Sequence, residues 1–565
     1  MPSSPSTPTP PPPPPLDWQA LPRPVSELLL RGSVGEAQLF SVADAALDPL
    51  DDKNCALAPE MQATLLTLAQ GAMLAAWEGD PLNVPCARHV LQLHEAFPYL
   101  DPALAAWGKI VRATKPYADA QAFNTLLLQG DTTALQRFLQ RTRRKEPRNL
   151  LLVRQGILAA FMQEDLDFAQ QWINESEALT KGVRTGISGD ICFARGQWRS
   201  ARQCYTAALR DMPCLLWRER LGEAALREGD VDACLDAWDT VLAARPWHTN
   251  LALRRHDIAH GLHQPGELPP GKGVILLYTF NKRDFIDTTL ASLMDSDTGQ
   301  TPVLVLNNGS TDGTVECLRG WEERSGGRIR GVYLPCNVGA PAARNWLLTE
   351  PECRAADWLA YLDDDVHLPA DWLRLLGRAM DIYPGHAVYG CRVVNHDTPM
   401  TLQSVDLHLE PGETREDLQD RDCTLEPVFA RRFAVSGIHH QTPDFGDFTY
   451  VRPCASVTGC CHLFRRESID AVGEFDVRFS PSQYDDLEHD IRHLLHGQWP
   501  IYQGHLRVRH MKRTGRAAMQ DKAQLLAAWG NAFKLQVKYT PEQFAELRER
   551  EYAILLEDMR RRMPG

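Results

Sequence analysis

Three adjacent carboxylates, Asp363, Asp364 and Asp365, end an apolar run in this 565-residue chain. The run, residues 359–362, has the pattern of a buried strand, and Pro369 opens a new segment after it. Carboxylates crowded in this way repel one another unless a cation lies between them. A hard divalent ion such as Mg²⁺ or Mn²⁺ takes oxygen ligands and bridges to phosphates, so the triplet is a candidate metal site. On its own it is equally compatible with a solvated acidic loop.

A second group of acids, Asp485, Asp486 and Glu488, opens a segment with helical periodicity. In a group-transfer enzyme one such carboxylate can accept the proton of an attacking hydroxyl. The same residues are also typical of an ordinary helix start, where negative charge is favourable to the helix dipole. Further along the chain, His510 follows a short strand-like run at 507–509, and its imidazole is either structural or a metal ligand.

The elements that must position these residues alternate between apolar runs and helical patterns. Continuous apolar runs predict strands that are buried on both faces, and helical periodicity predicts helices between them. The predicted strands are 274–278, 303–306, 331–334 and 358–362, and the predicted helices are 287–294, 314–324 and 342–349. This alternation is typical of a doubly wound, parallel α/β sheet. Because the strand ends of such sheets face the ligand crevice, we expect the acids at 363–365 to line it.

Five stretches, in the expected order, resemble the motifs of family 2 glycosyltransferases with the GT-A fold. They are Tyr278–Lys282, Asn307–Thr314, Asn337–Asn345, Asp363–Asp365 and Asp485–Glu488. Each motif alone is weak, but the five together identify residues 274–516 as a GT-A, Rossmann-like α/β domain. The resemblance covers less than half of the chain.

The resemblance implies a nucleotide diphosphate sugar as donor and a glycan or a protein as acceptor. Family members place donor-binding residues at the positions of Thr279, Asn307, Asn308 and Arg344. Asn307 stands where Asp is usual, and an amide can both donate and accept hydrogen bonds, so the base of the nucleotide stays open. For Arg344, a surface ion pair is the alternative.

The resemblance also implies a divalent metal cofactor, Mn²⁺ or Mg²⁺. Asp365 would hold the ion against the diphosphate, and Asp363 would contact the ribose and border the ion. His510 would be a further ligand, and an imidazole suits Mn²⁺ better than Mg²⁺. Asp486 takes the position of the catalytic base of an inverting transfer, while Asp485 stands where Glu is usual. The expected reaction is therefore an inverting, metal-dependent glycosyl transfer.

Residues 16–263 carry helical patterns, and the later part of this region repeats. The aromatic residues Phe138, Trp172, Tyr205 and Trp238 fall 34, 33 and 33 residues apart, each after a turn signal. This period resembles that of tetratricopeptide repeats, whose helix pairs bury their apolar faces by stacking. A non-repeating helical bundle is the alternative. In both cases we expect the region to hold a protein partner or the acceptor.

Composition and the flanking segments set further limits. The net charge of −13 argues against nucleic-acid binding, and no apolar run is long enough for a transmembrane segment. The absence of a secretion pattern predicts a cytoplasmic location. Residues 1–15 are predicted to be a disordered proline-rich tail, 264–273 a linker and 517–565 a helical segment. Residues 400–450 match no pattern.

Two other functions compete with glycosyl transfer. Asn307 and Asp485 depart from the family pattern, so the domain could be catalytically weak and act with the repeats as an interaction scaffold. A nucleotidyltransferase also holds metal with carboxylates beside a nucleotide, but that class lacks the segment around Asp486. Turnover of sugar nucleotides with and without Mn²⁺ separates the three.

Overall fold

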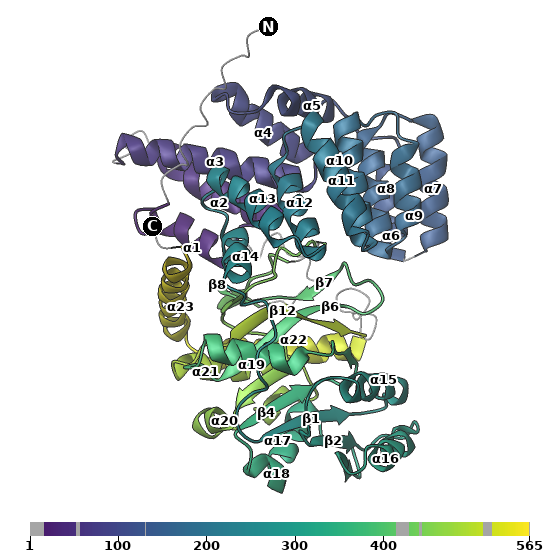
Figure 1. Cartoon of the computed structure of the whole chain (residues 1–565), viewed down its shortest axis with the longest axis vertical. Helices are drawn as coiled ribbons and strands as arrows, with labels where there is room; N and C mark the ends of the chain where they lie inside the picture. The colour runs from purple at the N-terminus through teal and green to yellow at the C-terminus, as the bar shows by residue number, and fades with distance from the viewer. Residues whose placement is uncertain are drawn as a thin grey trace. The chain divides into compact units, whose positions relative to one another are not determined.

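The computed structural model describes residues 16–51, 57–129, 131–413, 429–439, 443–511 and 522–563. The tail predicted at 1–15 lies outside these residues, as do parts of the unassigned stretch 400–450 and of the C-terminal segment. The chain divides into two compact units, residues 1–255 with 559–565, and residues 256–558. Figure 1 shows the helices of the first unit from purple to teal-blue and the strands of the second from teal to yellow-green.

Helices make up the described part of the first unit. Their bounds are α1 Arg23–Arg31, α2 Glu36–Asp51, α3 Pro59–Gly79, α4 Val84–Ala96, α5 Pro102–Arg112, α6 Ala120–Gln129, α7 Thr132–Lys145, α8 Leu150–Gln163, α9 Leu166–Asn174, α10 Lys181–Ala194, α11 Trp198–Asp211, α12 Leu215–Arg227 and α13 Val231–Ala244. α14, Thr249–Ala259, crosses the division between the units. The predicted helical character of this region is confirmed.

The same contacts recur in successive helix pairs of the first unit. The repeat aromatics are buried, and three of them pack against a helical glycine of the preceding helix: Trp172 against Gly156, Tyr205 against Gly189 and Trp238 against Gly222. An added Cβ at these glycines would lie 2.2, 2.6 and 2.6 Å from the rings, so the close approach of the helices depends on glycine. Recurrence at the predicted period is what the stacking of like units produces.

One mixed sheet organises the second unit, with the strand order β10-β12-β6-β11-β4-β1-β2-β3. The strands are β1 Gly273–Thr279, β2 Val303–Asn308, β3 Ile329–Leu334, β4 Trp358–Leu362, β5 Val366–His367, β6 Val388–Asn395, β7 Leu402–Ser404, β8 Leu409–Pro411, β9 Phe433–Val435, β10 Val451–Pro453, β11 Cys461–Arg465 and β12 Ile501–His510. The helices are α15 Arg283–Met294, α16 Thr314–Arg324, α17 Ala340–Leu348, α18 Pro351–Arg354, α19 Trp372–Ile382, α20 Arg466–Val472, η1 Val477–Phe479, α21 Asp485–Leu495, α22 Lys522–Lys538 and α23 Pro541–Arg562.

The four predicted strands are present, and β3, β2, β1 and β4 run parallel. The expected parallel sheet is therefore present in these four strands, but the whole sheet is mixed, because β11 runs antiparallel to β4 and β6, and β10 runs antiparallel to β12. Parallel neighbours need a long crossover connection, and helices supply it between β1, β2, β3 and β4. The chain before β10 is irregular, and its sequence does not indicate in which direction the next strands run. The short strands β7, β8 and β9 lie within the stretch that matched no sequence pattern.

The core of this unit lies between the sheet and the helices that cover it. Ile275 and Leu277 of β1 pack in one cluster with Val305 of β2 and with Leu290 of α15. Burial of such continuous apolar strands on both faces explains why their sequence pattern does not alternate. In the described ranges, no helix combines the length and the apolar character that crossing a membrane requires.

Candidate active site

The acidic triplet lies in the turn between β4 and β5, where the structure fixes the backbone from three sides. The Asp363 N–H donates to the Cys460 carbonyl oxygen at 3.0 Å, and the Met511 N–H donates to the Asp365 carbonyl oxygen at 2.8 Å. The hydroxyl of buried Thr289, on α15, donates to the Asp364 carbonyl oxygen at 2.9 Å. The turn therefore presents its carboxylates in a fixed arrangement.

Asp363, Asp365 and His510 converge on one point. Each offers one ligand atom, and these atoms lie within 4.8 Å of one another. His510, at the end of β12, has Nε2 2.9 Å from Asp365 Oδ1, while its Nδ1 lies 2.8 Å from Gln403 Oε1. With Nδ1–H donating to Gln403, Nε2 is the nitrogen that can ligate a metal. Two carboxylates and an imidazole are a donor set that fits Mn²⁺, and Mg²⁺ less well.

A lysine also reaches this acidic centre. Lys282 Nζ lies 2.6 Å from Asp365 Oδ2, and the side chain is partly exposed. Burial alone would raise the pKa of Asp365, but His510 and Lys282 hold that pKa well below its usual value. Burial, followed by the charge of Asp365, raises the pKa of Asp364 to about 7. Lys282 thus supplies positive charge at the carboxylate that, with Asp363 and His510, would hold a metal ion.

Arg344 connects the acidic turn to the second acidic segment. It lies buried on α17, with Nη1 2.7 Å from Asp485 Oδ2 and Nη2 3.2 Å from Tyr278 Oη. Its guanidinium also stacks over the Phe475 ring at 4.9 Å from the centroid, and Nη2 lies 4.0 Å from Asp363 Oδ1. The alternative of a surface ion pair does not hold for Arg344, because the ion pair that it makes is buried.

Asp485 and Asp486 begin α21 in different environments. Asp485 is buried against Arg344, and burial, which outweighs the arginine, raises its pKa to about 6. Asp486 is more exposed, and its Oδ2 accepts the Gly459 N–H at 2.9 Å. A Cβ at Gly459 would lie 3.0 Å from Asp486 Oδ2 and from Arg344 Nη2, so a larger residue would press on both side chains. Of the two carboxylates, Asp486 is the less buried.

The residues at the ends of β1 and β2 lie side by side, because Thr279 pairs in register with Asn307. Both are buried. Asn307 Oδ1 accepts the Ser310 N–H at 3.3 Å. Asn308 instead holds the next loop: its Oδ1 accepts the Val338 N–H at 2.9 Å and its Nδ2 donates to Asn337. The Asn308 side chain therefore holds the loop after β3 against the end of β2.

Sequence reasoning missed several residues of this centre. Lys282 and Tyr278 lie inside a quoted motif but received no role. Gln403 and Gly459 lie in or near irregular chain, and no spacing rule connects them to Asp365 or Asp486.

Comparisons with known proteins place this centre in a family context. Residues 274–473 match the family model described as Glycosyl transferase family 2. A Bacillus subtilis relative named "Putative teichuronic acid biosynthesis glycosyltransferase TuaG" is 34% identical over 91 residues, 16% of this chain and 34% of that protein. This chain thus spans about a third of the length of that relative. Asp485, Asp486 and His510 lie beyond the residues that the family model matches.

Solved structures show distant similarity. The mannosyltransferase PcManGT from Pyrobaculum calidifontis, in complex with GDP-Man and Mn²⁺, is 18% identical with a TM-score of 0.34, over 58% of this chain and 84% of that one. S. aureus TarS 1-349 in complex with UDP-GlcNAc is 15% identical with a TM-score of 0.32, over 49% and 70%. The match of residues 274–473 and the geometry of the strand ends agree: the chain carries a family 2 glycosyl transferase domain.

Proposed function

We propose that this protein transfers a sugar from a nucleotide diphosphate sugar to a hydroxyl of a glycan or protein acceptor, with inversion and with a divalent metal ion. The observation that carries the proposal is the convergence of Asp363, Asp365 and His510 in the second unit, which also holds the residues matched by the family model. A bound Mn²⁺ or Mg²⁺ neutralises the charge that develops on a diphosphate leaving group.

The other roles follow from the arrangement of the chain's own residues. Asp486 accepts the proton of the acceptor hydroxyl, supported by its exposure and by the Gly459 amide that orients it. Arg344 holds Asp485 and thereby fixes the start of α21. Thr279 and Asn307 contact the nucleotide, since they end adjacent strands at the crevice. Lys282, which lies beside Asp365, is a candidate to contact the diphosphate.

We further propose that the helical region 16–263 holds the acceptor or a protein partner, and that 274–516 carries catalysis. Every candidate site residue lies in the second unit, which supports this division. Stacked helix pairs present extended surfaces that suit a polymer or a polypeptide.

The test is turnover of a panel of UDP-, GDP- and dTDP-sugars by the purified protein, with Mn²⁺, with Mg²⁺ and with EDTA. We expect metal-dependent release of nucleoside diphosphate and, with an acceptor, a product of inverted anomeric configuration by NMR. Release of pyrophosphate would instead identify a nucleotidyltransferase. Nucleotide binding without any turnover would identify a scaffold with a weak transferase domain.

A further inference from the structure

The chain enters α21 through two residues in a costly conformation. Gln483 and Tyr484 have φ of 79° and 66°, in the left-handed region that side chains other than glycine rarely adopt. They immediately precede Asp485 and Asp486. Such backbone persists only where the surroundings fix it. We call residues 479–484 the entry turn.

Helix α22 supplies a polar anchor for the entry turn. The amide nitrogen of Asn531, which is 1% exposed, donates to the carbonyl oxygens of Phe479, Ser482 and Gln483 at 2.7, 2.9 and 3.1 Å. Leu535, on the same face of α22, is buried in one apolar cluster with Phe479.

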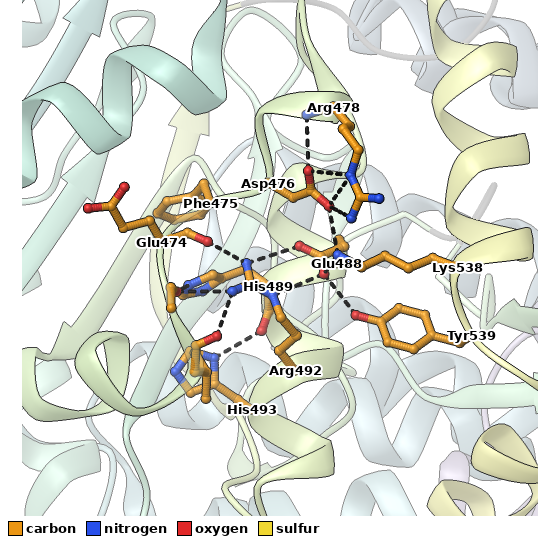
Figure 2. Close-up of polar contacts among 12 residues, drawn as sticks. Glu474, Phe475, Asp476, Arg478, Glu488, His489, Arg492, His493, Lys538 and Tyr539 are labelled. Atoms are coloured by element: carbon orange, nitrogen blue, oxygen red, sulfur yellow. Dashed lines mark hydrogen bonds and ion pairs between the residues drawn. The ribbon is translucent and has the colours of Figure 1, made fainter.

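A second anchor lies one turn further along α21. Glu488 is fully buried, and Figure 2 shows cations and a phenol gathered on its carboxylate. Lys538 Nζ lies 2.5 Å and Tyr539 Oη 2.8 Å from Glu488 Oε1. Arg492 donates to both carboxylate oxygens at 3.0 Å. Lys538 Nζ also lies 2.7 Å from Asp476 Oδ2, so it joins the chain before the entry turn to α21.

We infer that α22 and the residue after it position the proposed base: Asn531 holds the entry turn in its left-handed conformation, and Lys538 with Tyr539 holds Glu488, so that Asp486 faces the crevice. These three are positioning residues, which act through the entry turn and Glu488. The inference rests on the proposed function, in which Asp486 accepts the proton. It assigns a task to a segment that lies beyond the residues matched by the family model.

The chain offers a matched control on the same helix. Gln536 is also buried, and its amide makes three contacts, but with the backbone of Arg432 and Phe433 rather than with the entry turn. Asn531→Ala and Gln536→Ala therefore remove similar numbers of hydrogen bonds between α22 and two different segments. We expect both to lower Tm, and only Asn531→Ala to lower kcat, by roughly 10- to 100-fold, with an unchanged KM for the donor.

A second variant tests the left-handed backbone directly. Gln483 is exposed, and glycine adopts a positive φ at no steric cost. Gln483→Gly in the Asn531→Ala background should restore part of kcat. Lys538→Met should also lower kcat, while Lys538→Arg, which keeps the charge beside Glu488, should restore most of it. Equal losses of kcat in Asn531→Ala and Gln536→Ala would overturn the inference.

Hydrogen exchange of the full-length protein separates this inference from the proposed function. We expect the amides of residues 479–488 to exchange faster in Asn531→Ala than in Gln536→Ala, whether or not the donor panel identifies a substrate. Unchanged exchange in Asn531→Ala would overturn the inference even if the wild-type protein transfers sugar. Absence of all turnover in the wild type, with the expected change in exchange, would instead overturn only the proposed function.

Discussion

At the scale of single residues, the candidate metal site depends on Asp365. Its Oδ1 contacts His510, and its Oδ2 contacts Lys282. Asp365→Ala removes a ligand and should abolish transfer and metal-dependent nucleotide binding while the fold persists. Isothermal titration with nucleoside diphosphate in the presence of Mn²⁺ measures the binding, and circular dichroism shows whether the fold persists. Full activity of the wild type in EDTA would contradict a metal site.

The proposed base can be tested without a change of shape. Asp486→Asn retains an oxygen that can accept the Gly459 N–H but cannot take up a proton. We expect kcat to fall by about 10²-fold or more, with donor affinity preserved. Asp485→Asn is the matched comparison, and it should act mainly on stability, because it weakens the buried ion pair with Arg344. If Asp485→Asn alone abolished turnover, the roles of the two residues would be reversed.

Some residues of the site follow from the sequence, and others do not. Asp363 and Asp365 follow a strand whose apolar run is plain in the sequence, and His510 is expected beside them only because the family resemblance implies a histidine ligand there. Lys282 contacts Asp365 across 83 residues, and Gln403 contacts His510 across 107. Contacts of this kind arise from tertiary packing, and no local pattern in the sequence indicates them.

At the scale of elements, the helical glycines of the first unit set the distance between neighbouring helices. Alanine has the higher helix propensity, by up to about 1 kcal/mol, so Gly222→Ala would be stabilising at an open position. Here the added Cβ meets the buried Trp238 ring, and we expect a net destabilisation of roughly 1–3 kcal/mol by overpacking. Urea denaturation of the variant and the wild type measures this difference in the free energy of unfolding. Gly79→Ala, in a helix with nothing within 4 Å of the added Cβ, should cause no loss.

Helix α21 also carries buried histidines, which make the second unit sensitive to acid. Burial, the largest cause, lowers the pKa of His493 to about 4, and His489 beside it is lowered further. Both therefore remain neutral in the fold but take up protons in the unfolded chain, where the pKa is about 6.5. Stability should fall as pH drops from about 6.5 to 4, by about 3 kcal/mol for His493.

His493→Gln checks this assignment. Glutamine can still hydrogen bond with the Ser468 hydroxyl, which lies 3.2 Å from His493 Nε2, but it does not titrate. Urea denaturation at several pH values should show a shallower decline for the variant than for the wild type. An equally steep decline in both would assign the acid sensitivity to other groups.

The sequence predicts elements better than their directions. Strands that are buried on both faces can be recognised as continuous apolar runs, and β1 to β4 lie where those runs predict them. The antiparallel direction of β11 depends on the path of the irregular chain before it, which has no periodicity to interpret. Likewise, the helical pattern of α22 is visible in the sequence, but nothing in it indicates that Asn531 contacts the entry turn.

At the scale of the whole molecule, the division into units decides where the chain can be cut. The predicted linker begins at Gln264, yet contacts of the second unit begin earlier. Buried Asp257 accepts the Val451 N–H at 2.8 Å and lies 3.0 Å from His505 Nε2. Gly266 N–H donates to the Arg374 carbonyl oxygen at 3.2 Å. Residues 257–266 therefore pack with the unit that holds the candidate site.

A protein that begins at His256 should therefore fold and bind the nucleotide with Mn²⁺. One that begins at Pro270 loses the hydrogen bond from the Val451 N–H to Asp257, and we expect it to lose about 1–3 kcal/mol of stability or more. Thermal unfolding and nucleotide titration of the two proteins compare them directly. Equal stability of both would show that the chain before Pro270 contributes nothing to the second unit.

The same protein beginning at His256 tests what the helical unit is for. If its stacked helix pairs hold the acceptor, the shortened protein should hydrolyse the donor as the full chain does, but lose transfer to the natural acceptor. If the helices only bring copies of the chain together, acceptor transfer should persist, and light scattering should show fewer copies of the chain per particle. Loss of donor binding as well would mean that the two units depend on each other for folding. Donor hydrolysis, acceptor transfer and mass, measured on both proteins, therefore separate the two roles. Loss of acceptor transfer alone indicates that the helices hold the acceptor, and a change in the number of copies alone indicates that they assemble the protein.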